Sequence, residues 1–156
     1  MMLSCKQMAE KLEWAAVRAK NEIDIPTLTL MEEISVEAKS YIGHDQDEWA
    51  PLAKTTIEGW MGFPGKIELG YAPPDNPLLR EGTMRESIEA AAQKTNYGAE
   101  GVVGSKSLIA LWQEMGTVKN GAQSIPPRPF MAMAMGRSYA AADVIFGAFA
   151  WKVLTK

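Results

Sequence analysis

The sequence predicts an α+β fold in which helices at both termini pack on a small antiparallel sheet with long loops. Apolar residues recur every three or four positions in the first 43 residues, which is the spacing of amphipathic helices, and the chain ends in a long apolar stretch that also predicts a helix. Glycines and prolines crowd the centre, where only short stretches resemble strands. We therefore expect a single domain over residues 1–156, with a helical pair at 1–43, sheet and loops at 44–130 and a C-terminal helix at 131–156.

Two helices are expected in the first 43 residues. Ser4 is a suitable N-cap for a helix over residues 5–21, because its hydroxyl can accept hydrogen bonds from free backbone N–H groups. Pro26 interrupts this helix, since proline disfavours helix in the preceding residue and can itself begin a new one. The second helix is expected to run from Pro26 to Ile42, with Gly43 as its stop.

The centre is predicted to be loop with a few short elements. Residues 66–69 alternate between polar and apolar side chains, which would suit a short strand. Residues 83–93 fit a helix or a strand equally, whereas the β-branched stretch at 100–105 favours a strand. Residues 108–115 predict a short helix that ends at Gly116.

Composition and charge argue against several classes of function. The net charge is −3, with 16 basic and 19 acidic residues, so we expect no specific nucleic-acid binding. Cys5 is the only cysteine, which excludes an internal disulfide. The first 20 residues carry charges every few positions, unlike a secretory signal, and the apolar stretch 138–151 is too short to cross a bilayer. We expect neither export nor membrane insertion.

Side chains that could carry chemistry are few. His44, Asp45 and Asp47 place one imidazole near carboxylates, which leaves a small metal-dependent enzyme or factor open as an alternative. The run lacks the alternating ligands and the turn glycine of a calcium loop. Any Ser-His-Asp or Cys-His arrangement would need His44, and no serine lies in a G-x-S-x-G turn. We expect no enzyme, no cofactor and no metal.

Residues 125–130, IPPRPF, run directly into the most apolar part of the chain. The flanking prolines restrict the backbone around Arg128, whose guanidinium could bind a carboxylate or carbonyls at a subunit contact or within its own chain. Pro126 and Pro129 fit the PxxP spacing once, so docking on a proline-reading domain is a further alternative. We expect a rigid junction that directs the last helix toward a neighbouring subunit.

The last helix is apolar nearly all round its circumference. One small domain can hardly bury such a helix on every side, so we expect part of it to contact another chain.

Three stretches of the sequence resemble known motifs. Their order and spacing together are more specific than any single stretch. Residues 49–56, WAPLAKTT, fit W-x-P-L-x-x-x-T, and residues 77–88, PLLREGTMRESI, fit L-L-x-x-G-x-L-R-x-S-I with Met84 in place of leucine. Residues 113–117, QEMGT, and 125–131, IPPRPFM, fit x-E-x-G-T followed by I-P-x-R-P-F-L, with a Val-Gly-Ser at 103–105 before them. Together they resemble bacteriophage virion-morphogenesis and tail-completion proteins over residues 45–136. The family's Tyr-Ala before Glu-x-Gly-Thr is missing here.

The resemblance implies a structural protein of the phage neck, in head–tail connection or tail completion, without catalysis. Copies would form a ring around the DNA channel and contact other neck and tail proteins, in the virion and, during assembly, in the host cytoplasm. An acidic chain suits such a channel, because it attracts DNA weakly. The residues expected at interfaces are Trp49, Leu52, Glu114, Arg128, Pro129, Phe130, Met131, Phe146, Phe149 and Trp151.

Overall fold

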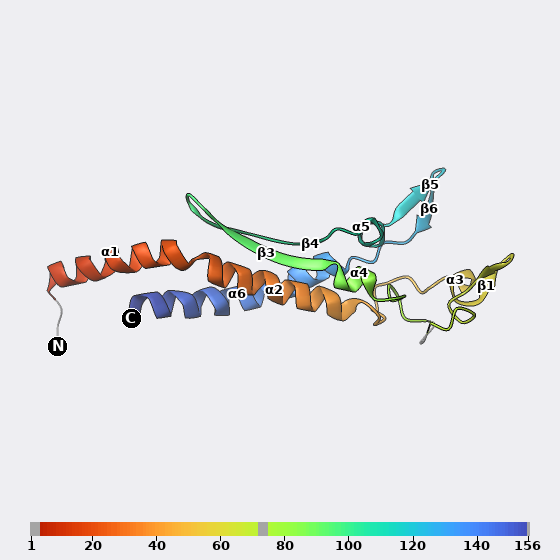
Figure 1. Cartoon of the computed structure of the whole chain (residues 1–156), viewed down its shortest axis with the longest axis horizontal. Helices are drawn as coiled ribbons and strands as arrows, with labels where there is room; N and C mark the ends of the chain where they lie inside the picture. The colour runs from red at the N-terminus through yellow and green to blue at the C-terminus, as the bar shows by residue number, and fades with distance from the viewer. Residues whose placement is uncertain (1–3, 72–74, 156) are drawn as a thin grey trace. The chain divides into compact units, whose positions relative to one another are not determined.

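The computed structural model of the chain describes residues 4–71 and 75–155. The fold is α+β, as predicted, with long helices at both termini and short antiparallel strand pairs between them (Figure 1). The elements are α1 (Cys5–Glu22), α2 (Asp24–Tyr41), α3 (Lys54–Glu58), β1 (Gly59–Trp60), β2 (Phe63–Pro64), α4 (Thr83–Glu86), β3 (Ile88–Thr95), β4 (Gly98–Ser105), α5 (Leu108–Met115), β5 (Thr117–Lys119), β6 (Ala122–Ile125) and α6 (Phe130–Thr155).

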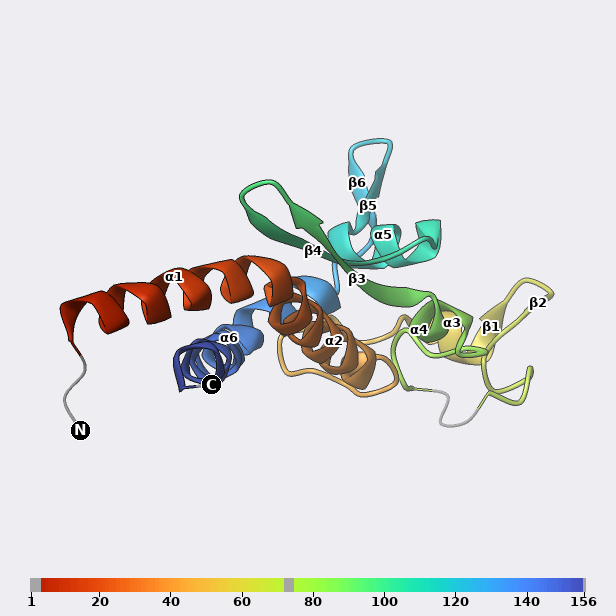
Figure 2. The same ribbon diagram turned by 60° about the vertical axis from the view of Figure 1, so that its left-hand side comes forward.

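The described strands form three separate two-stranded hairpins, visible in Figure 2. β1 pairs with β2 and β5 pairs with β6, both antiparallel. β3 pairs with β4 across the two residues Asn96 and Tyr97, a connection so short that the strands must be antiparallel. The turns of the other two hairpins are Met61-Gly62 and Asn120-Gly121, in which both residues have positive φ, as type I′ hairpin turns require.

The chain divides by its internal contacts into two compact units. Unit 1 comprises Met1–Ile34, Ala90–Val103 and Met135–Lys156, and unit 2 comprises Ser35–Glu89 and Gly104–Ala134. Each unit combines segments that are distant in the sequence, so the division does not follow the expected boundaries at residues 43 and 131. The single domain remains a prediction.

Unit 1 contains α1, the first part of α2, most of the β3–β4 hairpin and most of α6. Ser4 caps α1 as predicted: the Gln7 N–H donates to Ser4 Oγ at 3.3 Å, and the Ser4 N–H donates to Gln7 Oε1 at 2.9 Å. α1 and α6 lie side by side in both views, and Lys152 Nζ lies 3.8 Å from Glu22 Oε2. Gly101 of β4 lies against α2, where a Cβ atom would come within 2.6 Å of Met31 Cγ.

Unit 2 has the larger apolar core. Its buried apolar side chains include Ala38, Tyr41, Ile42, Trp49, Met84, Ile88, Ala110, Phe130 and Ala134. Gly43 ends the second helical stretch with a φ of +93° and donates its N–H to the Pro77 carbonyl at 3.0 Å. A Cβ atom at Gly43 would lie 2.9 Å from Leu79 Cδ2, so glycine allows residues 77–79 to pack closely here.

Several expected elements differ from the structure. The prediction of a strand at residues 66–69 is wrong. These residues form a turn, in which the Leu69 N–H donates to the Gly65 carbonyl at 3.0 Å. The ambiguous stretch at 83–93 is divided, with helix α4 first and strand β3 after Ser87. The break near Pro26 is a single residue, Ile23, because Pro26 lies in the first turn of α2, where no N–H donor is needed.

Two expected helices are confirmed. α5 spans the predicted residues Leu108–Met115, and α6 begins at Phe130, one residue before the predicted start. Across the described residues, none of the helices combines the length and the apolar character needed to span a membrane.

Candidate functional site

Arg128 joins separate segments of unit 2. Its side chain is only 4% exposed, and its Nη2 donates to the carbonyl of Ala50 at 2.8 Å. The Arg128 backbone N–H donates to the Gln113 carbonyl at 2.6 Å, and Nη1 donates to Gln113 Oε1 at 3.4 Å. The guanidinium therefore binds within its own chain, which is one of the two alternatives that the sequence leaves open.

The environment of Arg128 is polar but contains few charges. Burial lowers the pKa of Arg128, and the negative charge of Asp45 partly opposes this effect. The guanidinium remains charged, because the pKa of arginine lies far above neutral pH. Its Nε is buried and has no hydrogen-bond partner among the described residues. The charge is thus stabilised by carbonyl and amide oxygens, whose positions fix the direction of the side chain.

Glu114 caps the start of α6. Its Oε2 accepts a hydrogen bond from the Met131 N–H and its Oε1 accepts one from the Ala132 N–H, both at 2.9 Å. These N–H groups lie in the first turn of the helix, where no carbonyl of the helix can reach them. Pro129 has no side-chain oxygen to accept them, so a carboxylate from α5 replaces the usual cap and also meets the positive end of the helix dipole.

Gly116 allows the chain to pass close to residues 125–127. Its φ is +70°, and a Cβ atom there would lie 2.8 Å from the Ile125 carbonyl oxygen and 3.0 Å from the Pro127 nitrogen. Gln113, Glu114, Gly116 and Arg128 therefore act together: one residue caps α6, one permits the close approach and two hold the junction. We call Ala50, Gln113, Glu114, Gly116 and Arg128 the Arg128 bracket.

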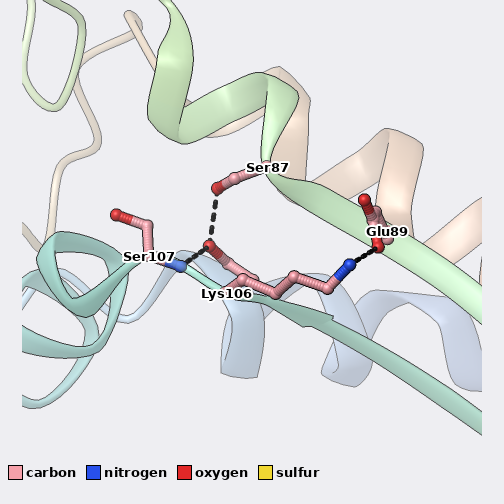
Figure 3. Close-up of polar contacts among 5 residues, drawn as sticks. Ser87, Glu89, Lys106 and Ser107 are labelled. Carbon is pink, nitrogen blue, oxygen red and sulfur yellow. Dashed lines mark hydrogen bonds and ion pairs between the residues drawn. The ribbon is translucent and has the colours of Figure 1, made fainter.

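Residues of the second motif and of the Val-Gly-Ser stretch meet at the base of the β3–β4 hairpin. The Ser87 and Ser105 hydroxyl oxygens lie 2.6 Å apart, and the Ser107 N–H donates to Ser105 Oγ at 3.0 Å (Figure 3). In the same view, Lys106 Nζ donates to Glu89 Oε2 at 2.8 Å. This contact lowers the pKa of Glu89 and raises the pKa of Lys106, since each charge stabilises the other.

The remaining positions of the second motif have structural roles. Gly82 has a φ of +84° and precedes α4, whose amide at Glu86 donates to the Gly82 carbonyl at 2.9 Å. Met84 is 7% exposed and Ile88 is 1% exposed. Both positions therefore belong to the core of unit 2.

A cavity of about 550 Å³ in unit 2 is lined by all three motif stretches. Leu52, Thr55 and Thr56 come from the first stretch, residues 78–84 from the second, and Gln113 and Arg128 from the third. Lys66 also lines it; burial lowers the pKa of this amine, against the opposing charge of Asp75. The lining side chains are mainly apolar, hydroxyl and basic groups, and neither histidine nor cysteine is among them.

The structure brings five of the expected interface residues together at the start of α6: Glu114, Arg128, Pro129, Phe130 and Met131. Phe130 is 1% exposed and belongs to the core of unit 2. Trp49 is likewise buried, with its ring centroid 6.5 Å from that of Tyr41, and Leu52 is half-buried.

The other expected interface residues lie in unit 1. Phe146 and Phe149 are half-buried in a groove between α1 and α6, and Trp151 is 70% exposed. A contact with another chain remains a prediction for all ten residues.

His44, Asp45 and Asp47 are exposed and lie in the turn that follows Gly43. Within residues 4–71 and 75–155, no three histidine, cysteine, aspartate or glutamate side chains are arranged to hold one metal ion.

The structural roles of two residues that complete the site were not identified from the sequence. Ala50 acts through its carbonyl, which every residue possesses, so no sequence signal exists for it. The sequence predicts Gly116 as a helix stop and a motif position, but the close approach to Ile125 and Pro127 depends on tertiary structure.

Comparisons with known proteins give no match. No family model matches the sequence, no curated protein matches it, and no solved structure matches the chain.

Proposed function

We propose that the chain is a structural component of the neck of a tailed bacteriophage, acting in head–tail connection or tail completion. One observation carries the proposal: the three stretches that resemble the tail-completion family, although dispersed over residues 49–131, line one cavity, and Arg128 of the third stretch binds Ala50 of the first. Sequence motifs that arise by chance have no reason to meet in space. Their convergence supports the view that they belong to one inherited structural unit.

The roles of the motif residues are mechanical. Glu114 caps α6, Gly116 permits the close approach of residues 125–127, and Arg128 connects the junction to Ala50. Such contacts stiffen the junction between the β5–β6 hairpin and α6, because each one removes freedom from a short linker. A stiff junction that directs a helix suits a protein that must present a defined face to its neighbours.

The proposed partners are further copies of the chain, arranged as a ring around the DNA channel, and other neck and tail proteins. The net charge of −3 fits a channel component, because DNA must pass without being held. The proposed location is the virion neck, after assembly in the host cytoplasm.

The location can be tested by immunogold electron microscopy of the phage that encodes the chain. An epitope tag at the N-terminus and an antibody to it should place gold particles at the junction between head and tail. An untagged phage provides the control for background labelling. Gold on the capsid surface or on tail fibres, or purified virions without the protein, would contradict the proposal.

A further inference from the structure

One apolar seam runs along α1 and ends at its C-cap residue, Ile23. Its members recur at alternating intervals of four and three residues, which is the spacing of helices that pack lengthwise against another helix. They are Cys5, Ala9, Leu12, Ala16, Ala19 and Ile23. From Leu12 onward, this seam faces α6 across an apolar groove of about 530 Å³. Phe146, Phe149 and Val153 are among the residues on the α6 side.

The groove against α6 does not reach the first turns of α1, because Leu12 is the first of the described residues of α1 that lines it. Every residue from Ser4 to Trp14 is exposed, including Met8 at 48% and Leu12 at 54%. Figures 1 and 2 both show α1 continuing past the last turn of α6. A helical segment of this length is marginal in water when nothing packs against it, even with the capping box at Ser4.

Unit 1 also has little core of its own. Among its described residues, the buried apolar side chains are Ala15, Pro26, Ile34 and Val153. Large apolar side chains on α1 and α6 are exposed instead, with Val17 at 61%, Val144 at 71% and Leu154 at 60%. Within residues 5–14 of α1, the large exposed apolar side chains are Met8, Leu12 and Trp14.

The charges beside the exposed residues 5–14 of α1 indicate that a second copy of this chain binds there. Lys6 and Glu13 are exposed, lie seven residues apart and therefore share one flank of α1. If a second α1 lies antiparallel over residues 5–14, Lys6 faces the partner's Glu13 and Glu13 faces the partner's Lys6. Met8 then packs against the partner's Leu12. A strongly acidic or strongly basic partner would match only one of the two charges.

We propose that the free chain forms a symmetric pair through residues 5–14 of α1, antiparallel and centred between Ala9 and Glu10. Both copies use the same surface, so the contact closes on itself and covers the exposed seam in each of them. The pair does not rest on the proposed neck function. In a phage neck, it would be the form of the protein that precedes contact with its ring neighbours.

Charge reversal with the full-length protein tests the pair. The wild type should sediment at twice 17.1 kDa. Lys6→Glu and Glu13→Lys should each weaken pairing about tenfold, because each places like charges opposite one another twice. The double variant Lys6→Glu/Glu13→Lys should restore wild-type pairing. Lys11→Glu reverses a charge of the same helix away from this flank and should leave pairing unchanged.

Disulfide trapping tests the register independently. In a Cys5→Ser background, Ala9→Cys should form a covalent pair on mild oxidation, because the two copies of residue 9 lie next to each other on either side of the centre of symmetry. Lys11→Cys in the same background should remain uncrosslinked. Circular dichroism verifies that all variants keep the wild-type helix content.

A monomer at every concentration, an assembly of more than two copies, or a pair whose stability does not change with the charge reversals would overturn the proposal. A larger ring would do so without contradicting the neck function.

Discussion

Arg128 places a positive charge in the interior of unit 2 where neutral oxygens bind it. Taking a charge out of water is unfavourable, so the side chain is stable there only while its donors reach both Gln113 and Ala50. Arginine can do this because its planar fork carries several N–H groups at fixed angles, whereas the lysine amine is a single point of charge.

Arg128→Lys should therefore destabilise the protein. We expect the free energy of unfolding to fall by about 2–3 kcal/mol, because the hydrogen bond to Ala50 is lost while a buried charge remains. Urea denaturation followed by tryptophan fluorescence measures this change. The matched control is Arg85→Lys, which alters an exposed arginine of unit 2 and should change stability by less than about 0.5 kcal/mol. Equal effects of the two substitutions would contradict the role given to Arg128.

Gly116 offers a second test at the residue scale, with a control in the adjoining hairpin. Gly116→Ala combines an unfavourable positive φ with a clash against the Ile125 carbonyl. We therefore expect the free energy of unfolding to fall by about 2–4 kcal/mol. Gly121 has a similar φ of +77°, but nothing lies within 4 Å of a Cβ atom there. Gly121→Ala should lower the free energy of unfolding by only about 1 kcal/mol, because only the positive φ is unfavourable there. Thermal unfolding of both variants measures the difference, and losses of equal size would rule out the close approach.

At the scale of elements, α5 supplies the cap of α6 through the Glu114 carboxylate. Glu114→Ala removes the acceptors of two N–H groups in α6 and should reduce stability by about 1–2 kcal/mol. Glu114→Gln retains one acceptor and should lose about half as much. Urea denaturation with circular dichroism at 222 nm monitors the helix, and Glu68→Ala in an exposed turn is the control. If Glu114→Ala behaves like Glu68→Ala, Glu114 does not cap α6.

The elements show what the sequence could predict. The bounds of α5 can be predicted because an amphipathic run ends at a glycine, and the cap at Ser4 can be predicted because its hydroxyl is a local signal. The β5–β6 hairpin was missed, although Asn120-Gly121 is a strong signal for a type I′ turn. The turn at Met61 could not be anticipated, since methionine rarely adopts the φ of +46° found there.

The site was less predictable than the helices. Arg128 and Glu114 were singled out, but their partners depend on tertiary structure: the contact of Arg128 with Ala50 spans 78 residues and ends on a backbone carbonyl. The hydroxyl contact between Ser87 and Ser105 likewise joins residues that are 18 positions apart. Local patterns identify which residues are unusual, whereas the fold decides what they bind.

At the scale of the whole molecule, the charge balance predicts little affinity for DNA. With a net charge of −3, the chain should give no mobility shift of duplex DNA at about 10 µM protein and about 0.1 M salt, where proteins with basic surfaces bind non-specifically. Electrophoresis over a series of salt concentrations measures this. A shift that weakens as salt is added would reveal phosphate contacts and would contradict the expected absence of nucleic-acid binding.

The central claim, a role in joining heads to tails or completing tails, is tested most directly by complementation in vitro. Extracts of cells infected with the encoding phage, from which the gene has been deleted, should contain DNA-filled heads and separate or abnormal tails. Adding the purified wild-type protein should raise the titre of infectious particles by several orders of magnitude. Adding buffer should leave the titre unchanged. Normal virions in the extract that lacks the protein, or full infectivity without its addition, would contradict the account.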